Sequence, residues 1–380
     1  MAFQRINLVF IAIFITLGTL ASHATSRSLY EASLAEKHEQ WMAKHGRVYP
    51  NAAEKERRLG IFRKNVEYVE KFNNEANKTY KLNINKFSDM TDEEFRRYHT
   101  GFKMPPGLSS TSSNFSYQSL AATDIPTSVD WREQQAVTPI KDQKACGACW
   151  AFTVTAAVEG LTKIKTSQLI SLSEQQLVDC DHQNNGCGGG TLESAYSYVE
   201  QNGGLAREET YPYQATDMGT CDTNKESEHA AQITGYESVP SRSENDLQKA
   251  VAMQPVSVGI SAYGQDFKMY NSGVFSGECG TDLNHAITAI GYGTTEDGIP
   301  YWLMKNSWGE DWGESGYMRI LRNSDAPEGM CGLALHPVYP TALYQTNNIR
   351  PRPFPYLYEL KYDSGWEAEK LDSFAAVLHF

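Results

Sequence analysis

The order of apolar and polar positions predicts a small helical domain near the start of the chain. Residues 25–103 are polar and rich in charge, and six positions within them recur at intervals of three or four. Such spacing places them along one side of a long helix. Glu54 four residues before Arg58 is also the favourable order for a helical ion pair. We expect the helical domain over about residues 36–95. The six positions are Glu54, Arg58, Phe62, Asn65, Val69 and Asn73.

The pattern changes twice further along. Residues 104–124 are rich in Pro, Gly, Ser and Thr, so they bury too little apolar surface for a core, and we expect an exposed, cleavable linker. Cys149–Lys165 carries apolar residues at helical spacing, which predicts a buried helix that begins at or just before Cys149. Later runs are short and β-rich, as in residues 255–260, 285–293 and 301–309. A helical half therefore precedes a sheet-rich half, and a cleft between two halves is a common place for a site.

The first residues have the layout of a secretory signal peptide. Arg5 precedes an apolar stretch from Ile6 to Leu20, and small residues then stand at Ser22 and Ala24. We expect cleavage after about Ala24, which makes residues 1–24 the signal peptide. The alternative is a membrane anchor, but the apolar run is short for a span of roughly 20 residues. We expect no membrane association after cleavage.

Composition and charge narrow the class of protein. The chain has 380 residues, which is enough for two or three domains, and 41% of them are hydrophobic, as in globular proteins. Its formal net charge of −12 argues against nucleic-acid binding, because contact with phosphates needs a basic face.

The cysteines suggest a free thiol. There are seven, none before Cys146 or after Cys331. A secretory route favours disulfides, and an odd number leaves one thiol over. Cys146 and Cys149 form a Cys-x-x-Cys motif, which suits a redox pair or half of a zinc site. A redox pair would be expected within a thioredoxin-like βαβ unit, which does not surround this motif. A zinc site would need a second pair of ligands, and the other cysteines are scattered.

A third interpretation makes Cys149 a nucleophile. A thiol at the start of a helix has its thiolate stabilised by the unpaired N–H groups and the helix dipole. A thiolate nucleophile also needs a proton carrier and a group that orients it. His285 opens one β-rich run and Asn306 lies in another, with Trp308 and Trp312 beside it.

At this point the sequence resembles the papain family of cysteine peptidases, and in particular plant vacuolar and senescence-associated members. Upstream, the stripe of six residues resembles the helical motif of the family's inhibitory propeptide, and Asn85, Phe87 and Asp89 resemble its second motif. The resemblance implies an α+β, papain-like two-domain fold, with a helical left domain and a β-barrel-like right domain, preceded by a helical inhibitory propeptide. The motifs that carry it are VDWR at Val129–Arg132, CGACWAF at Cys146–Phe152, SEQQLVDC at Ser173–Cys180 and GYG at Gly291–Gly293.

The resemblance also implies roles for single residues. Cys149 would attack the peptide carbonyl, and His285 would share and then donate the proton. Asn306 would orient the imidazole, with Trp308 shielding that bond from water. Gln143 would act with the Cys149 backbone N–H on the developing oxyanion. The implied disulfides are Cys146–Cys187, Cys180–Cys221 and Cys279–Cys331.

Substrate contacts follow from the same resemblance. Mostly small, apolar walls suggest Leu, Val or Phe at the second position before the cleaved bond. His336 is either a solvated surface residue or the pocket floor, where protonation below about pH 6.5 would favour polar or acidic residues. Lys144 departs from the family, which usually has Gly there, so the loop that carries Gln143 is expected to be slightly reshaped. The residues placed against substrate are Gly189, Gly190, Thr191, Leu192, Gly259, Leu283, Ala286, Trp308 and His336.

These inferences predict a cysteine endopeptidase made as a zymogen. Residues 25–124 would be the propeptide and intramolecular inhibitor, and residues 125–340 the peptidase domain. Acid would loosen the propeptide by protonating carboxylates such as Glu54 and Asp89. Residues 341–380 are a tail of unknown role: disordered or removable, a sorting signal, or a wrongly assigned terminus.

Further expectations concern partners and location. The glycosylation sequons at Asn77 and Asn114 lie upstream of the expected cut. We expect protein and peptide substrates, inhibition by cystatin-type proteins, a monomer, and no metal or cofactor. The secretory route leads to a vacuole or lysosome, or to the extracellular space. Two rivals from other classes are a catalytically silent binding or storage protein and a redox protein that uses Cys146 and Cys149.

Overall fold

The computed structural model describes residues 30–105 and 115–342, which all lie in one compact unit of the chain. The expected signal peptide, Asn114 and nearly all of the expected tail fall outside these residues. In the described part, no helix is both long and apolar enough to cross a membrane. The named elements are α2 (Ala52–Asn74), β1 (Tyr80–Leu82), α3 (Asp92–His99), η1 (Ala122–Asp124), β2 (Val129–Asp130), α4 (Cys149–Thr166), α5 (Glu174–Cys180), η2 (Gly186–Gly188), α6 (Leu192–Gln201), α7 (Thr223–Glu226), β3 (Gly235–Ser238), α8 (Glu244–Met253), β4 (Val256–Ile260), α9 (Gln265–Lys268), β5 (Tyr270–Phe275), β6 (His285–Thr294), β7 (Pro300–Lys305), β8 (Tyr317–Leu321), η3 (Met330–Gly332) and β9 (Pro337–Thr341).

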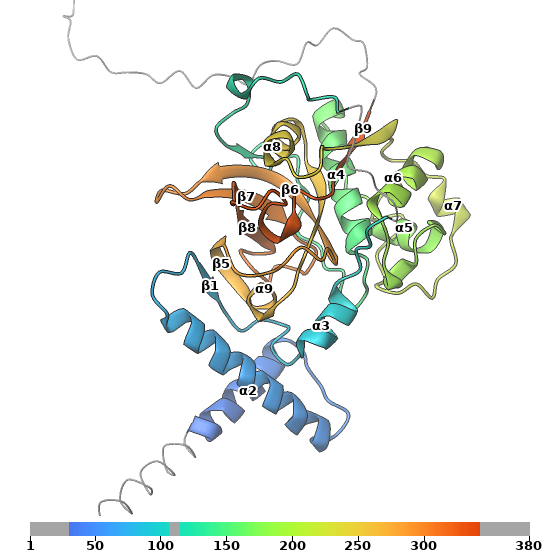
Figure 1. Cartoon of the computed structure of the whole chain (residues 1–380). Helices are drawn as coiled ribbons and strands as arrows, with labels where there is room; N and C mark the ends of the chain where they lie inside the picture. Colours follow the sequence, from blue (N-terminus) through green and yellow to red (C-terminus); the bar gives the residue numbers. More distant parts are fainter. Residues whose placement is uncertain (1–29, 106–114, 343–380) are drawn as a thin grey trace, which may run out of the picture. The chain divides into compact units, whose positions relative to one another are not determined.

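The N-terminal segment is built on two helices that cross, residues 30–44 and α2 (Figure 1). Helix α2 begins at Ala52 because the side chain of Asn51 accepts the N–H of Glu54. The predicted long helix is therefore confirmed. Its inner face buries Phe62 against Trp41 of the first helix, with ring centroids 5.3 Å apart.

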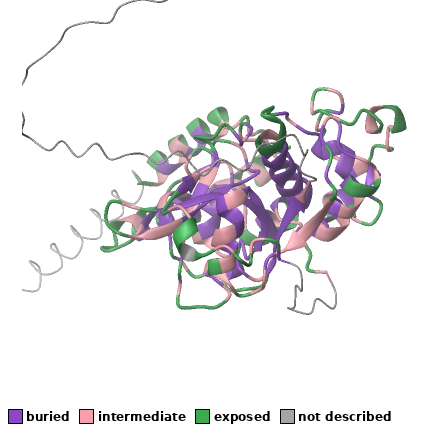
Figure 2. Cartoon of the chain, turned by 90° about the horizontal axis from the view of Figure 1, so that it is seen from above, coloured by how far each residue is buried: buried purple, intermediate pink, exposed green. Residues whose placement is uncertain are grey.

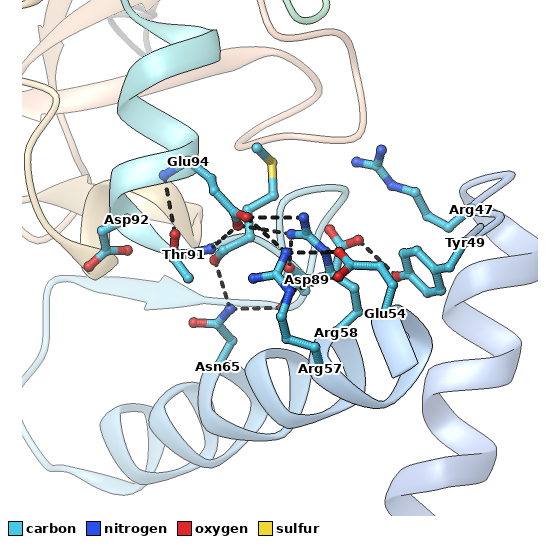
Figure 3. Close-up of polar contacts among 12 residues, drawn as sticks. Arg47, Tyr49, Glu54, Arg57, Arg58, Asn65, Asp89, Thr91, Asp92 and Glu94 are labelled. Atoms are coloured by element: carbon cyan, nitrogen blue, oxygen red, sulfur yellow. Dashed lines mark hydrogen bonds and ion pairs between the residues drawn. The ribbon is translucent and has the colours of Figure 1, made fainter. Parts of the chain in front are cut away.

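Ion pairs tie α2 to α3 (Figure 3). Arg58 donates to Glu54 at 2.7 Å, which is the pair predicted from their spacing, and to Glu94 at 2.8 Å. Glu94 also closes a capping box with Thr91, so the same carboxylate fixes the start of α3. The position of α3 determines where the following residues lie, because the chain passes from the end of this helix directly into the site described below.

The peptidase part consists of the two halves that the sequence predicts. Its sheet follows the order β1-β5-β8-β7-β6-β4-β9-β3, with β2 paired to β6. Strand β6 is central, and nine of its ten residues are buried, which is typical of a strand covered on both faces. All named pairings are antiparallel except β5 with β8.

Helix α4 forms the centre of the helical half. It begins at Cys149, as predicted, and its first fourteen residues are all buried. Figure 2 colours the molecule by burial, with the buried residues of the interior in purple. Thr153 of α4 donates to the carbonyl of Ile287 in β6 at 2.9 Å, so the helix lies directly against the central strand. The start of α4 and the start of β6 are thereby held at the junction of the two halves.

The N-terminal segment docks on the sheet half by extending its sheet. Strand β1 pairs with β5, with Tyr80 opposite Gly273. The hydroxyls of Tyr68 and Tyr80 both donate to the carboxylate of Asp266 in α9. Backbone pairing and buried polar contacts of this kind fix one register of docking.

The expected exposed linker over residues 104–124 is exposed at most of its described positions, but Phe115 and Tyr117 depart from this pattern. Phe115 is buried in the core of the sheet half, and Tyr117 stacks on Tyr339 with ring centroids 5.3 Å apart. Ser116 donates to Glu237 from both its backbone N–H and its hydroxyl. Two aromatic side chains supply enough apolar surface to hold an otherwise polar stretch against the domain.

Replacing Phe62 by Ala tests whether the small N-terminal core holds this segment together. Phe62 is 0% exposed, and Phe→Ala changes in cores cost about 3–5 kcal/mol. We expect hydrogen exchange of the α2 amides to accelerate strongly in Phe62→Ala. Val48→Ala is the control, because Val48 is 89% exposed and its truncation should change stability by less than about 0.5 kcal/mol. Equal protection in both variants would contradict this account.

Candidate active site

Cys149 is the one free cysteine in the described part of the chain. It is the first residue of α4, and Ala148 before it provides no side-chain cap, so the N–H groups of the first turn remain available to a thiolate. Cys146 is bonded to Cys187, which excludes a Cys146–Cys149 redox pair. The structure contains the disulfides Cys146–Cys187, Cys180–Cys221 and Cys279–Cys331, the pairs that the resemblance implies.

His285 is held in one orientation by two neighbours. Its Nε2 lies 2.8 Å from Oδ1 of Asn306, and since an amide oxygen only accepts, Nε2 carries the hydrogen. The ring of Trp308 stacks on the imidazole, with centroids 4.3 Å apart. Nδ1 is buried and has no hydrogen-bond partner among the described residues. This tautomer leaves Nδ1 available to take up a proton.

Gln143 is fixed beside these groups. Its Oε1 accepts the hydroxyl of Ser307 at 2.6 Å, which orients the amide so that Nε2 is the donor end. That Nε2 donates to the carbonyl of Cys146 at 2.8 Å and to the carbonyl of His99 at 3.3 Å. Gln143 therefore has the donor chemistry of an oxyanion hole.

The turn after Gln143 depends on Asp142. Lys144 has a φ of 53°, in the left-handed region that favours Gly, so a side chain is strained there. The carboxylate of Asp142 accepts the Lys144 N–H at 2.9 Å and supports this turn. The loop keeps the left-handed backbone that Gly would adopt most easily, although Lys stands there.

Residues that follow α3 fill the cleft with backbone. The N–H groups of Gly101 and Phe102 both lie 3.0 Å from the carbonyl of Asn284. Lys103 donates to the carbonyl of Gly190, and Gly190 donates to that of Gly101, so Phe102 forms a parallel bridge with Gly190. A segment paired in parallel runs opposite to a substrate that would pair antiparallel with Gly190, so this is the geometry of a reversed segment.

Close approach of the two backbones needs glycine on both sides. A Cβ on Gly189, which has a φ of 102°, would lie 2.2 Å from the carbonyl oxygen of Gly101. A Cβ on Gly101 would lie 1.9 Å from the carbonyl oxygen of Gly147. Neither position accommodates another residue without a shift of backbone.

Phe102 occupies the apolar pocket that the sequence predicts for substrate. It is 4% exposed and belongs to the same buried cluster as Leu192, Leu283 and Ala286. A Cβ on Gly259 would meet the Phe102 ring at 2.6 Å, so this glycine makes room for it. Thr191, which the sequence predicts to contact substrate, caps α6, because its hydroxyl accepts the N–H of Ser194.

His336 lies at this pocket and is buried, so the interpretation as a solvated surface residue is wrong. It is 4% exposed, and its ring centroid lies 6.1 Å from that of Phe102. Its Nε2 is 2.6 Å from Oε1 of Glu193 in α6. A protonated His336 therefore has a carboxylate partner of its own.

Burial keeps the two reacting groups neutral while the cleft is filled. Burial raises the pKa of the Cys149 thiol to about 11, and backbone N–H groups of Ala286 and Gly101 offset this only in part. Burial also lowers the pKa of His285 to about 4, against a smaller opposite effect of its bond to Asn306. At neutral pH, this form holds a thiol and an uncharged imidazole.

A buried charge cluster lies behind Asn306. Lys305, the residue before it, donates to Thr138 at 2.7 Å, and Thr138 donates to Glu159 of α4 at 2.5 Å. Lys141, just before the turn that carries Gln143, donates to the same Glu159 at 3.0 Å. The loop that carries Gln143 and the loop that carries Asn306 are thus both linked to the carboxylate of Glu159 in the core.

Four residues that complete the site escaped sequence reasoning. Three of them hold other site residues in place: Ser307 bonds to Gln143, Asp142 to the Lys144 N–H, and Glu193 faces His336. The fourth, Phe102, fills the apolar pocket. Residues of these types are common on ordinary surfaces and in ordinary cores. The sequence could have pointed to Ser307 and Asp142, because each lies next to a predicted site residue. Nothing comparable singles out Glu193 or Phe102.

Comparison with known proteins agrees with this geometry. The family described as papain family cysteine protease matches residues 125–341, and the cathepsin propeptide inhibitor domain (I29) matches residues 38–95. The chain is 52% identical over 316 residues to the senescence-specific cysteine protease SAG12 of Arabidopsis thaliana, covering 82% of this chain and 91% of that protein. It is 46% identical over 348 residues to vignain of Vigna mungo, covering 90% and 95%.

Solved structures show the same relationship. The recombinant stem bromelain precursor matches with a TM-score of 0.75 and 43% identity, over 82% of this chain and 99% of that one. The proform of the Amb a 11 cysteine protease, a major ragweed pollen allergen, matches with a TM-score of 0.75 and 39% identity, over 82% and 95%. The chain belongs to the papain family of cysteine proteases and is a cysteine endopeptidase in its zymogen form, with an I29 propeptide as intramolecular inhibitor.

Proposed function

We propose that Cys149 and His285 carry out peptide-bond hydrolysis, with Asn306 and Gln143 in support. The observation that carries this is the Nε2–Asn306 bond of His285, which leaves Nδ1 without a partner at the site of the one described free thiol. Nδ1 takes the thiol proton and the thiolate attacks the peptide carbonyl carbon. The charge that develops on the carbonyl oxygen is met by Nε2 of Gln143 and the backbone N–H of Cys149.

The remaining steps return the site to its starting state. The imidazolium gives its proton to the leaving amine, and the acyl group stays on sulfur as a thioester. Water then attacks the thioester while His285 accepts its proton, which releases the acid and restores the thiol. Asn306 holds the imidazole in the required tautomer throughout, and Trp308 keeps water away from their bond.

The zymogen boundaries are part of the proposal. Residues 25–124 form the removable propeptide, the cut falls near Asp124–Ile125, and residues 125–340 remain as the mature, monomeric enzyme. Asn77 is exposed at the end of α2 and would carry glycan only on the precursor. The vacuole or lysosome, or the extracellular space, is the destination, and cystatin-type proteins are candidate inhibitors.

Glu54 responds to acid only at the lower end of the proposed activation range. Hydrogen bonds from Arg57 and Arg58 lower its pKa to about 2, so the carboxylate stays ionised at pH 4–5. In an unfolded propeptide its carboxyl would titrate near 4.5, so Glu54 weakens the folded propeptide only as the pH falls below about 4.5.

His99 is a better candidate for the acid trigger. It is buried between Phe87 and Phe95, and its carbonyl blocks Gln143. Burial lowers its pKa to about 3, with Lys86 adding to the effect and Asp142 opposing it. A released His99 would titrate near its ordinary value of 6.5.

The direction in which pH changes propeptide docking follows from the pKa of His99 in the docked state and in the released state. Between about pH 6.5 and pH 3 the released state binds more protons than the docked state, so docking weakens as the pH falls. One such group contributes at most about 1.4 kcal/mol per pH unit. Burial lowers the pKa of His38 and of His45 in the same segment, which adds to the effect.

Apolar side chains at the second position before the cleaved bond are the proposed preference. Phe102 already shows that an aromatic ring fits this pocket against Gly259 and Leu283. Glu193 faces His336, so the pocket contains a carboxylate that repels acidic side chains. The preference should therefore stay apolar at acid pH.

The reactivity of Cys149 tests its masking by the propeptide. At pH 7, a thiol with a pKa of about 11 has roughly 300-fold less thiolate than one near 8.5. We expect iodoacetamide to alkylate Cys149 of the precursor at least about 100-fold more slowly than Cys149 of the processed enzyme. Mass spectrometry of the labelled peptide gives both rates. Similar rates would refute the masking, and no labelling after processing would refute Cys149 as the nucleophile.

His99→Gln tests the acid trigger, because Gln keeps a polar side chain that does not titrate in this range. The readout is the ratio of precursor conversion rates at pH 5 and pH 7, followed by gel. This ratio should fall several-fold in the variant, with an upper limit of roughly 30-fold from the linkage above. His182→Gln, at an exposed position of the peptidase domain, should keep the original ratio. An unchanged ratio in His99→Gln would exclude His99.

Glu193→Gln tests the pocket pair. Peptides with Leu, Phe or Glu at the second position before the cleaved bond are compared at pH 5 and pH 7.5. The unmodified enzyme should favour Leu and Phe at both values, whereas the variant, which lacks the carboxylate that faces His336, should accept Glu several-fold better. Equal acceptance of Glu by the unmodified enzyme and the variant would show that Glu193 does not set this preference.

A further inference from the structure

The carboxylate of Asp142 lies on the leaving-group side of the reacting pair. Asp142 is joined to Trp308 by a β-bridge, and Trp308 stacks on His285, which gives its proton to the leaving amine. Phe102 marks the other side of the cleft, in the pocket for residues before the cleaved bond. Between them, the carbonyl of His99 is bound by Gln143 and by Nε1 of Trp308 at 3.1 Å.

The propeptide places a cation on this carboxylate. Nζ of Lys86 lies 2.6 Å from Oδ2 of Asp142 and is largely buried in the complex. The other oxygen, Oδ1, is used internally by the Lys144 N–H. One oxygen of Asp142 thus shapes the loop, and the other binds an ammonium group that belongs to the segment filling the cleft.

The peptidase domain has no substitute for Lys86 among its described residues. The only ion pair of Asp142 in the described structure is with Lys86. Lys141 next to it is committed to Glu159 and Glu174 in the core. Asp311 adds a second negative charge near Lys86 and pairs with His45 of the propeptide at 3.7 Å.

We propose that Asp142 is a specificity residue that selects a basic side chain in the first three substrate residues after the cleaved bond. In the zymogen, Lys86 occupies this position, and removal of the propeptide exposes a fixed carboxylate that lacks a cation. A Lys or Arg side chain of a substrate restores the pair at Oδ2. This inference rests on the proposed function, since it assigns the side of the cleft from the role of His285.

Matched peptides measure this preference in the acid-processed enzyme. Internally quenched peptides keep Phe at the second position before the cleaved bond and carry Lys, Gln or Glu at one of the first three positions after it. At one of these positions we expect kcat/KM to be about two- to fivefold higher for Lys than for Gln, the range for a partly exposed ion pair, and lower for Glu. The advantage of Lys should shrink in high salt because mobile ions screen the pair.

Asp142→Asn identifies the carboxylate responsible. Its amide oxygen still accepts the Lys144 N–H, and the ratio of Lys to Gln peptides cancels any change in overall activity. The ratio should fall to about one in this variant. Glu296→Gln, which removes an exposed charge in the β6–β7 turn, should keep the full ratio.

The outcomes separate this inference from the proposed function. Cleavage of all peptides with a ratio near one, or an unchanged ratio in Asp142→Asn, overturns the role of Asp142 while the protease mechanism stands. Failure of the processed enzyme to cleave any peptide overturns the proposed function itself.

Discussion

Backbone hydrogen bonds between the propeptide and the cleft hold the zymogen in its inactive form. The N–H groups of Gly101 and Phe102 meet the carbonyl of Asn284, and Lys103 and Gly190 complete the pairing. Because these bonds involve backbone, they work only if the cleft is shaped to accept a peptide chain. The inhibitor therefore uses the substrate's own binding surface. Burial of Cys149 and His285, and the neutral state that follows from it, are consequences of this one contact.

The rest of the propeptide keeps that contact in place. Its core around Phe62, the ion pairs of Arg58 and the bonds of two tyrosines to Asp266 all lie away from the cleft. They fix the position of α3, and the chain enters the cleft directly from the end of that helix. Stability of a small helical domain is thus linked to occupancy of an active site, and the proposed titration of buried histidines near α3 would act on the whole unit through this link.

Patterns that repeat along the chain were predictable, and pairwise contacts were not. The spacing of apolar residues predicted α2 and the start of α4, and the odd number of cysteines pointed to a free thiol. The partners of the site residues carry no periodic signal: Ser307 orients Gln143 and Glu193 faces His336 only through folding. Average composition also misled at Phe115 and Tyr117, where two aromatic rings outweigh many small polar neighbours.

The reversed direction of the cleft segment has a kinetic consequence. Phe102 pairs in parallel with Gly190, so its peptide bonds run opposite to those of a substrate that would pair antiparallel there, and they would offer the sulfur a poorly placed carbonyl. A precursor molecule in this state does not cut the segment that it holds. First conversion then depends on an encounter between two molecules, one of them already open. Accumulation of active enzyme should show a lag that shortens as the precursor becomes more concentrated, so the concentration of the precursor would itself set the timing of activation.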